Sequence, residues 1–170
     1  MQKPRHIVVM GVSGSGKTTL AEHLAQRLGW AFAEADDFHP PSNIAKMASG
    51  RPLNDEDRWP WLMAIRNWIE QQDQQGKSSV VPCSALKRSY RDLLRGDGSL
   101  DVQFVHLQGS RTVLAERMQH RSGHFMPVSL LDSQLFTLEV PGPDEAVLPL
   151  DLQRTPEQLT EEVVRFIGEH

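Results

Sequence analysis

Short apolar runs alternate with amphipathic stretches along this chain. The first run, residues 7–10, is rich in β-branched side chains, as strands buried in a parallel sheet are. Leu20, Leu24 and Leu28 follow at helical spacing, and Gly29 stands where the residue just past a helix C-terminus is expected. The chain therefore opens with a strand, a turn and a helix.

The alternation continues to the C-terminus. Apolar or alternating runs predict further strands at residues 30–35, 79–83, 102–107 and 146–150. Apolar stripes at helical spacing predict helices that include residues 42–47, 61–69, 86–95, 113–118, 131–138 and 159–167. Pro82 is awkward inside a central strand, so the end of the third strand is the least certain boundary. Strands alternating with helices predict an α/β sandwich around one parallel sheet, whose strand order the pattern leaves open.

The turn between the first strand and the first helix carries the most specific motif. Residues 11–18 fit the P-loop pattern G-x-x-x-x-G-K-[ST]. Its glycines allow the backbone to approach a polyphosphate closely, and the following helix directs its free N–H groups at the phosphates. Lys17 is expected to reach the β- and γ-phosphates, and the Thr18 hydroxyl to ligate Mg²⁺. The alternative is a Gly/Ser-rich turn from strand to helix that binds no ligand. A match to the full pattern is rare by chance, and with a strand before it and a helix after it we favour the P-loop.

Composition and charge narrow the class of protein. The chain has 170 residues, enough for a single domain over 1–170, and its net charge of −4 disfavours sequence-independent binding to nucleic acid. Cys83 is the only cysteine, so no disulfide forms within the chain. No signal peptide and no apolar run long enough for a bilayer is visible, so we expect a cytoplasmic enzyme without a membrane partner.

Charged residues near the expected carboxyl ends of strands suggest the second substrate. Asp36 and Asp37 follow the second strand, although acidic residues are equally at home in a polar turn before a helix. Arg58, Lys87 and Arg91, with Arg88 beside them, would form a cationic cluster opposite the nucleotide and would suit a carboxylate. A solvated helix face is the competing interpretation of that cluster.

Two further arginines precede a glycine-containing connection. Arg117 and Arg121 are four residues apart on a predicted helix and its end. Phosphoryl transfer needs positioning and cationic stabilisation, which a closing lid could deliver. Arginines near a helix C-terminus also complement the helix dipole, so a purely structural role is the alternative.

Nearly the whole chain resembles the gluconate kinases, the short P-loop gluconokinase family, which is similar in fold to shikimate and nucleoside-monophosphate kinases. The residues that carry the resemblance are 10–17, 36, 39–40, 43–44, 46–47, 49–50, 52–55, 57–58, 61–62, 83–87, 90–95, 123–125, 133–134 and 138–139. The resemblance implies a three-layer P-loop NTPase-type fold with strand order 2-3-1-4-5, helices on both faces and a helical lid over about residues 118–138. It also implies ATP-dependent phosphorylation of D-gluconate at the 6-hydroxyl, Mg²⁺ and a homodimer.

The resemblance also implies roles for individual residues. Catalytic roles fall to Lys17, Asp36 and Arg121, with Asp36 favoured over Asp37. ATP would be bound by Gly11, Val12, Ser13, Gly14, Ser15, Gly16, Lys17, Thr18, Thr19 and Arg117. The substrate would be bound by Asp36, His39, Arg58, Lys87, Arg91 and His124, and Mg²⁺ by Thr18.

Two departures from the family pattern and two rival functions stay open. Thr18 stands where the family usually has serine, which keeps the hydroxyl. The third strand lacks an acidic Walker B residue and has Ser84 nearby, so Mg²⁺ would rest on Thr18, the phosphates and water. A kinase of the same fold could act on shikimate or another small anion. An ATP-binding regulatory switch is the rival from another class, but it would need no arginine-lined acceptor pocket.

Overall fold

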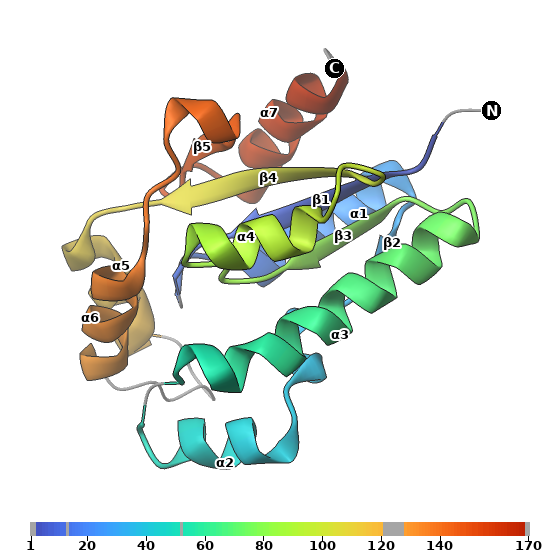
Figure 1. Ribbon diagram of the computed structural model, residues 1–170. Coiled ribbons are helices and arrows are strands. Elements are labelled where there is room, and N and C mark those ends of the chain that lie inside the picture. Colours follow the sequence, from blue (N-terminus) through green and yellow to red (C-terminus); the bar gives the residue numbers. More distant parts are fainter. Residues whose placement is uncertain (1–2, 13, 52, 121–127, 169–170) are drawn as a thin grey trace.

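The chain folds around a parallel sheet with the strand order β2-β3-β1-β4-β5, so the order implied by the family resemblance is confirmed (Figure 1). The computed structural model describes residues 3–12, 14–51, 53–120 and 128–168, apart from the side chains of 118–120 and 128–130. The strands are β1 (Arg5–Met10), β2 (Ala31–Phe32), β3 (Ser79–Pro82), β4 (Asp101–Gln108) and β5 (Leu148–Asp151).

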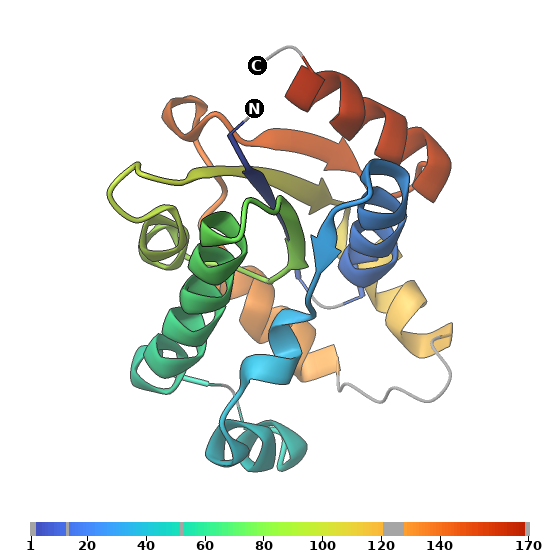
Figure 2. The same ribbon diagram turned by 90° about the vertical axis from the view of Figure 1, so that its right-hand side faces the viewer.

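Helices cover both faces of the sheet, as a parallel sheet requires. They are α1 (Lys17–Leu28), α2 (Pro41–Ala48), α3 (Asp55–Gln74), α4 (Arg88–Arg95), α5 (Arg111–His120), α6 (Val128–Thr137) and α7 (Pro156–Gly168), with short 3₁₀ turns η1 (Ala35–Phe38) and η2 (Pro143–Glu145). Helices α3 and α4 lie on one face, and α1 and α7 on the other (Figure 2). Helix α6 lies beyond the carboxyl ends of β1 and β4 (Figure 1).

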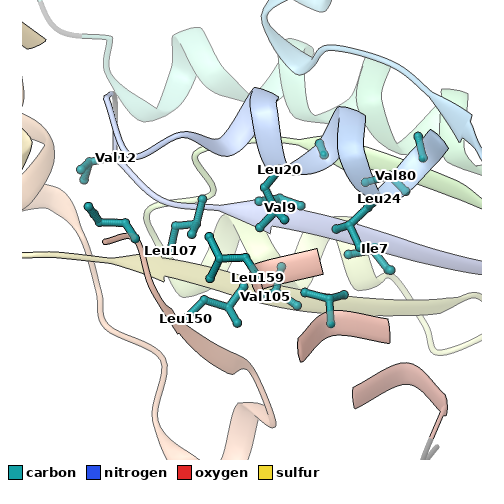
Figure 3. Packing of buried hydrophobic residues seen from close by; sticks show 14 of the residues in the cluster. Ile7, Val9, Val12, Leu20, Leu24, Val80, Val105, Leu107, Leu150 and Leu159 are labelled. Atoms are coloured by element: carbon teal, nitrogen blue, oxygen red, sulfur yellow. The ribbon is translucent and has the colours of Figure 1, made fainter. Parts of the chain in front are cut away.

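The central strand β1 is apolar on both faces because both are buried. Ile7 and Val9 point into the cluster with α1 and α7, which Figure 3 shows. Val8 and Met10 point into the second cluster, with α3 and α4. Alternate residues of one strand thus join different cores. None of the helices within the described ranges is long and apolar enough to cross a membrane.

The second strand is shorter than the sequence suggests. The run over 30–35 predicts a strand, but β2 ends at Phe32, and Glu34 caps the 3₁₀ turn η1 by accepting a hydrogen bond from the Asp36 N–H. Pro82, in contrast, is tolerated as the last residue of β3, because the next ladder bond comes from the N–H of Cys83 to the Val9 carbonyl at 2.9 Å.

Local capping signals are realised in the structure. Gly29 adopts the left-handed conformation (φ 69°) just after α1, and its N–H donates to the Ala25 carbonyl. Asn54 and Asp57 form a capping box that starts α3. These caps fix where α1 ends and where α3 begins, and α3 carries Arg58 toward the carboxyl edge of the sheet.

Candidate active site

The P-loop turns tightly between β1 and α1. Gly11 has a φ of 153°, and a Cβ at this position would lie 2.8 Å from Ser15 Oγ and 3.0 Å from the Leu107 carbonyl oxygen. Gly16, with a φ of 96°, precedes the first helical residue, Lys17, whose ammonium donates to the Val12 carbonyl at 3.2 Å. The loop therefore curls around itself and leaves the N-terminus of α1 open toward a ligand.

Arg117 lies next to this loop. A Cβ on Gly16 would be 3.6 Å from Arg117 Nη1, and Arg117 Nη2 donates to the Leu152 carbonyl at 2.6 Å. Arg117 and Thr19 both line a hollow of about 190 Å³ beside the loop. The structure thus brings Arg117 and Thr19 together with the P-loop, as the sequence predicts for residues that contact a nucleotide.

A carboxylate that the sequence reasoning missed faces the P-loop threonine. Thr18 Oγ1 donates to Glu34 Oε2 at 2.6 Å, and Glu34 Oε1 accepts from the Asp36 N–H at 3.4 Å. Burial raises the pKa of Glu34 above its usual value. A hydroxyl and a carboxylate are the hard oxygen donors that Mg²⁺ prefers, so this corner fits the metal. Among the described residues, no group of three or more His, Cys, Asp or Glu is placed to hold a metal by itself.

A cavity of about 280 Å³ adjoins the P-loop at the carboxyl edge of the sheet. Lys17 and Asp36 line it on the P-loop side, and His39 and Arg58 are also part of its wall. Asp36 and Asp37 are both exposed, but Asp37 is not among the lining residues. Of the two neighbouring aspartates, Asp36 is therefore the one that the structure brings to the cavity.

His39 and Arg58 are both held in place by aromatic side chains. The His39 ring stacks on Trp61 at 4.3 Å between centroids, and its Nδ1 lies 3.2 Å from Asn43 Nδ2. Burial lowers the pKa of His39, so the ring is neutral near pH 7. The guanidinium of Arg58 donates to Tyr90 OH at 3.0 Å and lies over the ring of that tyrosine. Both residues can thus present fixed hydrogen-bonding groups to a ligand.

Lys87 lies outside the cavity wall. Its ammonium donates to Asp55 Oδ1 at 2.9 Å, and the same oxygen accepts the hydroxyl proton of Tyr90. These bonds, the one from Tyr90 first, lower the pKa of Asp55. The structure therefore brings Lys87 to the residues that hold Arg58, and Lys87 is not among the residues that line the cavity.

The structure corrects the prediction that Arg91 is part of a cationic cluster that binds the substrate. Its side chain is fully buried, and its guanidinium forms a two-pronged ion pair with Glu145 at 2.7 Å. The remaining N–H groups donate to the carbonyls of Ala85, Leu86 and Glu139. All five donors of the guanidinium are therefore engaged, and none is left for a substrate. Arg91 holds the segment after α6 against α4.

Cys83 lines the cavity but is not a nucleophile. Its side chain is buried, and burial raises the pKa of its thiol to about 12. A buried, neutral thiol is a poor nucleophile, so Cys83 is not suited to a covalent step.

The sequence reasoning missed part of the cavity wall. Arg51 lines it from the loop after α2, and Ser133, Gln134 and Thr137 line it from α6. The three residues of α6 are spaced i, i+1 and i+4, a signal that the sequence carries beside the leucine stripe of the same helix. Three predicted site residues, Ser13, Arg121 and His124, lie outside the residues that the structure describes.

Comparison with known proteins places these features in a family. A family model described as an AAA domain matches residues 7–126. The chain is 55% identical over 163 residues to a gluconokinase of Gluconobacter oxydans, with 96% of this chain and 91% of the relative covered.

Solved structures agree with this similarity. A crystal structure of a sugar kinase from Janibacter superposes with a TM-score of 0.90 at 54% identity, covering 97% of this chain and 95% of the other. A gluconokinase from Sinorhizobium meliloti superposes with a TM-score of 0.87 at 47% identity, covering 99% and 94%. At such identities over nearly the whole chain, the likeness shows a shared family as well as a shared fold.

The buried ion pair predicts a pH-dependent loss of stability. Hydrogen bonds from Arg91 above all hold the pKa of Glu145 at about 2, below its ordinary value of 4.5. The pair therefore stabilises the fold fully above pH 4.5, and this contribution is lost as the pH falls toward 2. Glu145→Gln strands the Arg91 charge and should lower the free energy of unfolding by about 3 kcal/mol at pH 7.

Urea unfolding at several pH values measures this effect. The difference between the original chain and Glu145→Gln should shrink between pH 5 and pH 3. Asp144→Asn is the matched control, because Asp144 pairs with Arg88 at the exposed surface and should change stability by less than about 1 kcal/mol. A constant difference from pH 7 to pH 3 would contradict the assigned role of the pair.

Proposed function

Because this chain belongs to the gluconokinase family, we propose that it transfers the γ-phosphoryl group of ATP to the 6-hydroxyl of D-gluconate, giving 6-phospho-D-gluconate and ADP. One observation carries the proposal. Lys17, which belongs to the P-loop, and Asp36 line the same cavity as Arg58. A phosphate-binding loop, a carboxylate and a cation for the acceptor thus meet around one space.

ATP is the phosphoryl donor in this proposal, and the chain offers it the P-loop. The N–H groups at the start of α1 would bind the phosphates, with Lys17 on the β- and γ-phosphates. Thr18 would be the protein ligand of Mg²⁺, and Glu34 would orient its hydroxyl through the 2.6 Å hydrogen bond. When bound, Mg²⁺ supplies positive charge that neutralises the phosphate oxygens.

Asp36 is the proposed contact for the acceptor hydroxyl. Its carboxylate would accept a hydrogen bond from the hydroxyl and align an oxygen lone pair with phosphorus. The proton would pass to the carboxylate late, as the oxygen bonds to phosphorus. Arg58 would bind the gluconate carboxylate, since a guanidinium fork matches a carboxylate, and the neutral His39 ring would contact a hydroxyl.

The lid, the location and the oligomer are further parts of the proposal. Residues of about 118–138 would close over the phosphates, with Arg117 and Arg121 stabilising the transferring group and His124 contacting the substrate. The proximity of Arg117 to Gly16 supports the proposed role of Arg117 near the phosphates. We also propose a cytoplasmic enzyme that forms a homodimer, which sedimentation of the purified chain would test.

An acceptor panel tests the function directly. ADP release with Mg·ATP is measured for D-gluconate, shikimate, other aldonic acids and simple sugars. Turnover selective for D-gluconate, with the product phosphorylated at C6, is the expected result. Selective turnover of another acid would overturn the substrate assignment, and ADP release independent of any acceptor would overturn the kinase assignment.

The two neighbouring aspartates offer a matched pair of variants. Asp36→Asn should lower kcat by about 100-fold or more, because the hydroxyl loses its hydrogen-bond acceptor and proton acceptor, while the KM for ATP changes little. Asp37→Asn should leave kcat within about twofold, since Asp37 does not line the cavity. Steady-state kinetics of both variants checks this. Equal losses in the two variants, or a loss only in Asp37→Asn, would refute the role given to Asp36.

A further inference from the structure

Helix α6 turns a polar face toward the acceptor cavity. Ser133, Gln134 and Thr137 line the cavity and are half-buried. Their spacing confines them to an arc of roughly 100° on the helix surface. Within the described part of α6, Leu131 and Leu135 pack against the core on a different face. The polar residues therefore do not arise from a helix that simply faces solvent.

The outward face of the same helix shows how unusual this arrangement is. Phe136 is 92% exposed, although it is the largest apolar residue of α6. A helix placed only to fill the core would bury its phenylalanine and expose its serine and threonine. Here the hydroxyl groups face the cavity and the aromatic ring faces water. This distribution is explained if the cavity receives a ligand that is rich in hydrogen-bonding groups.

One hydroxyl on this face has a defined orientation. Thr137 Oγ1 donates its proton to the Ser133 carbonyl at 2.9 Å. A hydroxyl whose proton is committed in this way still offers oxygen lone pairs. Thr137 is therefore set to accept a hydrogen bond, and its natural partner is a donor such as an alcohol O–H.

The rest of the cavity wall indicates which chemical groups two further parts of the ligand would carry. Arg51 and Arg58 bring positive charge to the cavity, which suits an acid group. Lys17 and Asp36 occupy the side next to the P-loop. The polar face of α6 lines the same cavity as the arginines and Asp36. It can therefore contact groups that lie between the acid end of a ligand and its reacting hydroxyl.

We infer that α6 determines which acids are phosphorylated, because the hydroxyl groups of Ser133 and Thr137 bind secondary hydroxyl groups along the acceptor chain. The inference rests on the proposed function and extends it to the middle of the acceptor. An acid that lacks the matching hydroxyl leaves an oxygen of α6 without a partner inside the cavity, and this lowers its transition-state binding. Selectivity for a polyhydroxy acid over an acid with fewer hydroxyl groups then follows from α6 rather than from the arginines.

A double-mutant cycle between protein and acceptor tests the inference. The acceptors are D-gluconate and its 2-, 3-, 4- and 5-deoxy analogues, and the variants are Thr137→Val and Ser133→Ala. Thr137→Val should raise the KM for D-gluconate and lower kcat/KM about five- to tenfold, with the KM for ATP unchanged. At least one deoxy acid should lose about five- to tenfold in kcat/KM with the original chain but less than about twofold with the matching variant.

Phe136→Ala is the control, because it alters the same helix on the face that points away from the cavity. It should retain the full discrimination between D-gluconate and every deoxy analogue. Thermal unfolding verifies that each variant is folded. If Thr137→Val does not fold, the double-mutant cycle is measured with Ser133→Ala alone.

The outcomes separate the inference from the function on which it rests. If every deoxy acid loses the same factor with the original chain and with both variants, α6 does not bind the acceptor hydroxyls and the inference is wrong. Failure of the original chain to phosphorylate D-gluconate would instead overturn the proposed function. Turnover of D-gluconate with no coupling leaves the function standing and removes only the role of α6.

Discussion

The close approach between the P-loop and the end of β4 constrains everything else in the site. Gly11 leaves β1 with a backbone conformation that favours glycine, and a side chain there would meet both Ser15 and the carbonyl of Leu107. This contact lets the loop fold back above the sheet. The first turn of α1 then begins at Lys17, directly over the carboxyl ends of the central strands.

The carboxyl edge of the parallel sheet collects the remaining groups. The segment after β2 supplies Glu34 and Asp36, and the segment after β3 supplies Cys83 and Ser84. These strands neighbour one another in the order β2-β3-β1, so their ends lie next to the P-loop. Glu34 bonds to Thr18 on one side and to the N–H of Asp36 on the other. A short chain of hydrogen bonds thereby connects the expected metal ligand to the backbone of Asp36, the proposed contact of the acceptor hydroxyl.

Much of the fold and the phosphate side of the site could be predicted from sequence, because their signals are local. The P-loop motif, the glycine after α1 and the capping box of α3 each lie within a few residues. The cationic cluster could not be resolved in that way. Arg91 and Lys87 share a helix face in the sequence, but the partner of Arg91 is Glu145, 54 residues away. Only the tertiary fold shows that one arginine is enclosed while Arg58, from another helix, reaches the cavity.

The cations near the acceptor therefore have different tasks, and burial decides which task each takes. A fully enclosed guanidinium must have every donor satisfied, and Arg91 meets this condition only by joining two distant segments of the chain. Lys87 is partly exposed, and its charge is directed at Asp55, which also accepts the hydroxyl of Tyr90. Tyr90 in turn accepts a hydrogen bond from Arg58. Lys87 and Asp55 thus orient the tyrosine that contacts Arg58, although Lys87 itself is not part of the cavity wall. If Arg58 binds the acid as we propose, specific binding would depend on this supporting set as well as on Arg58.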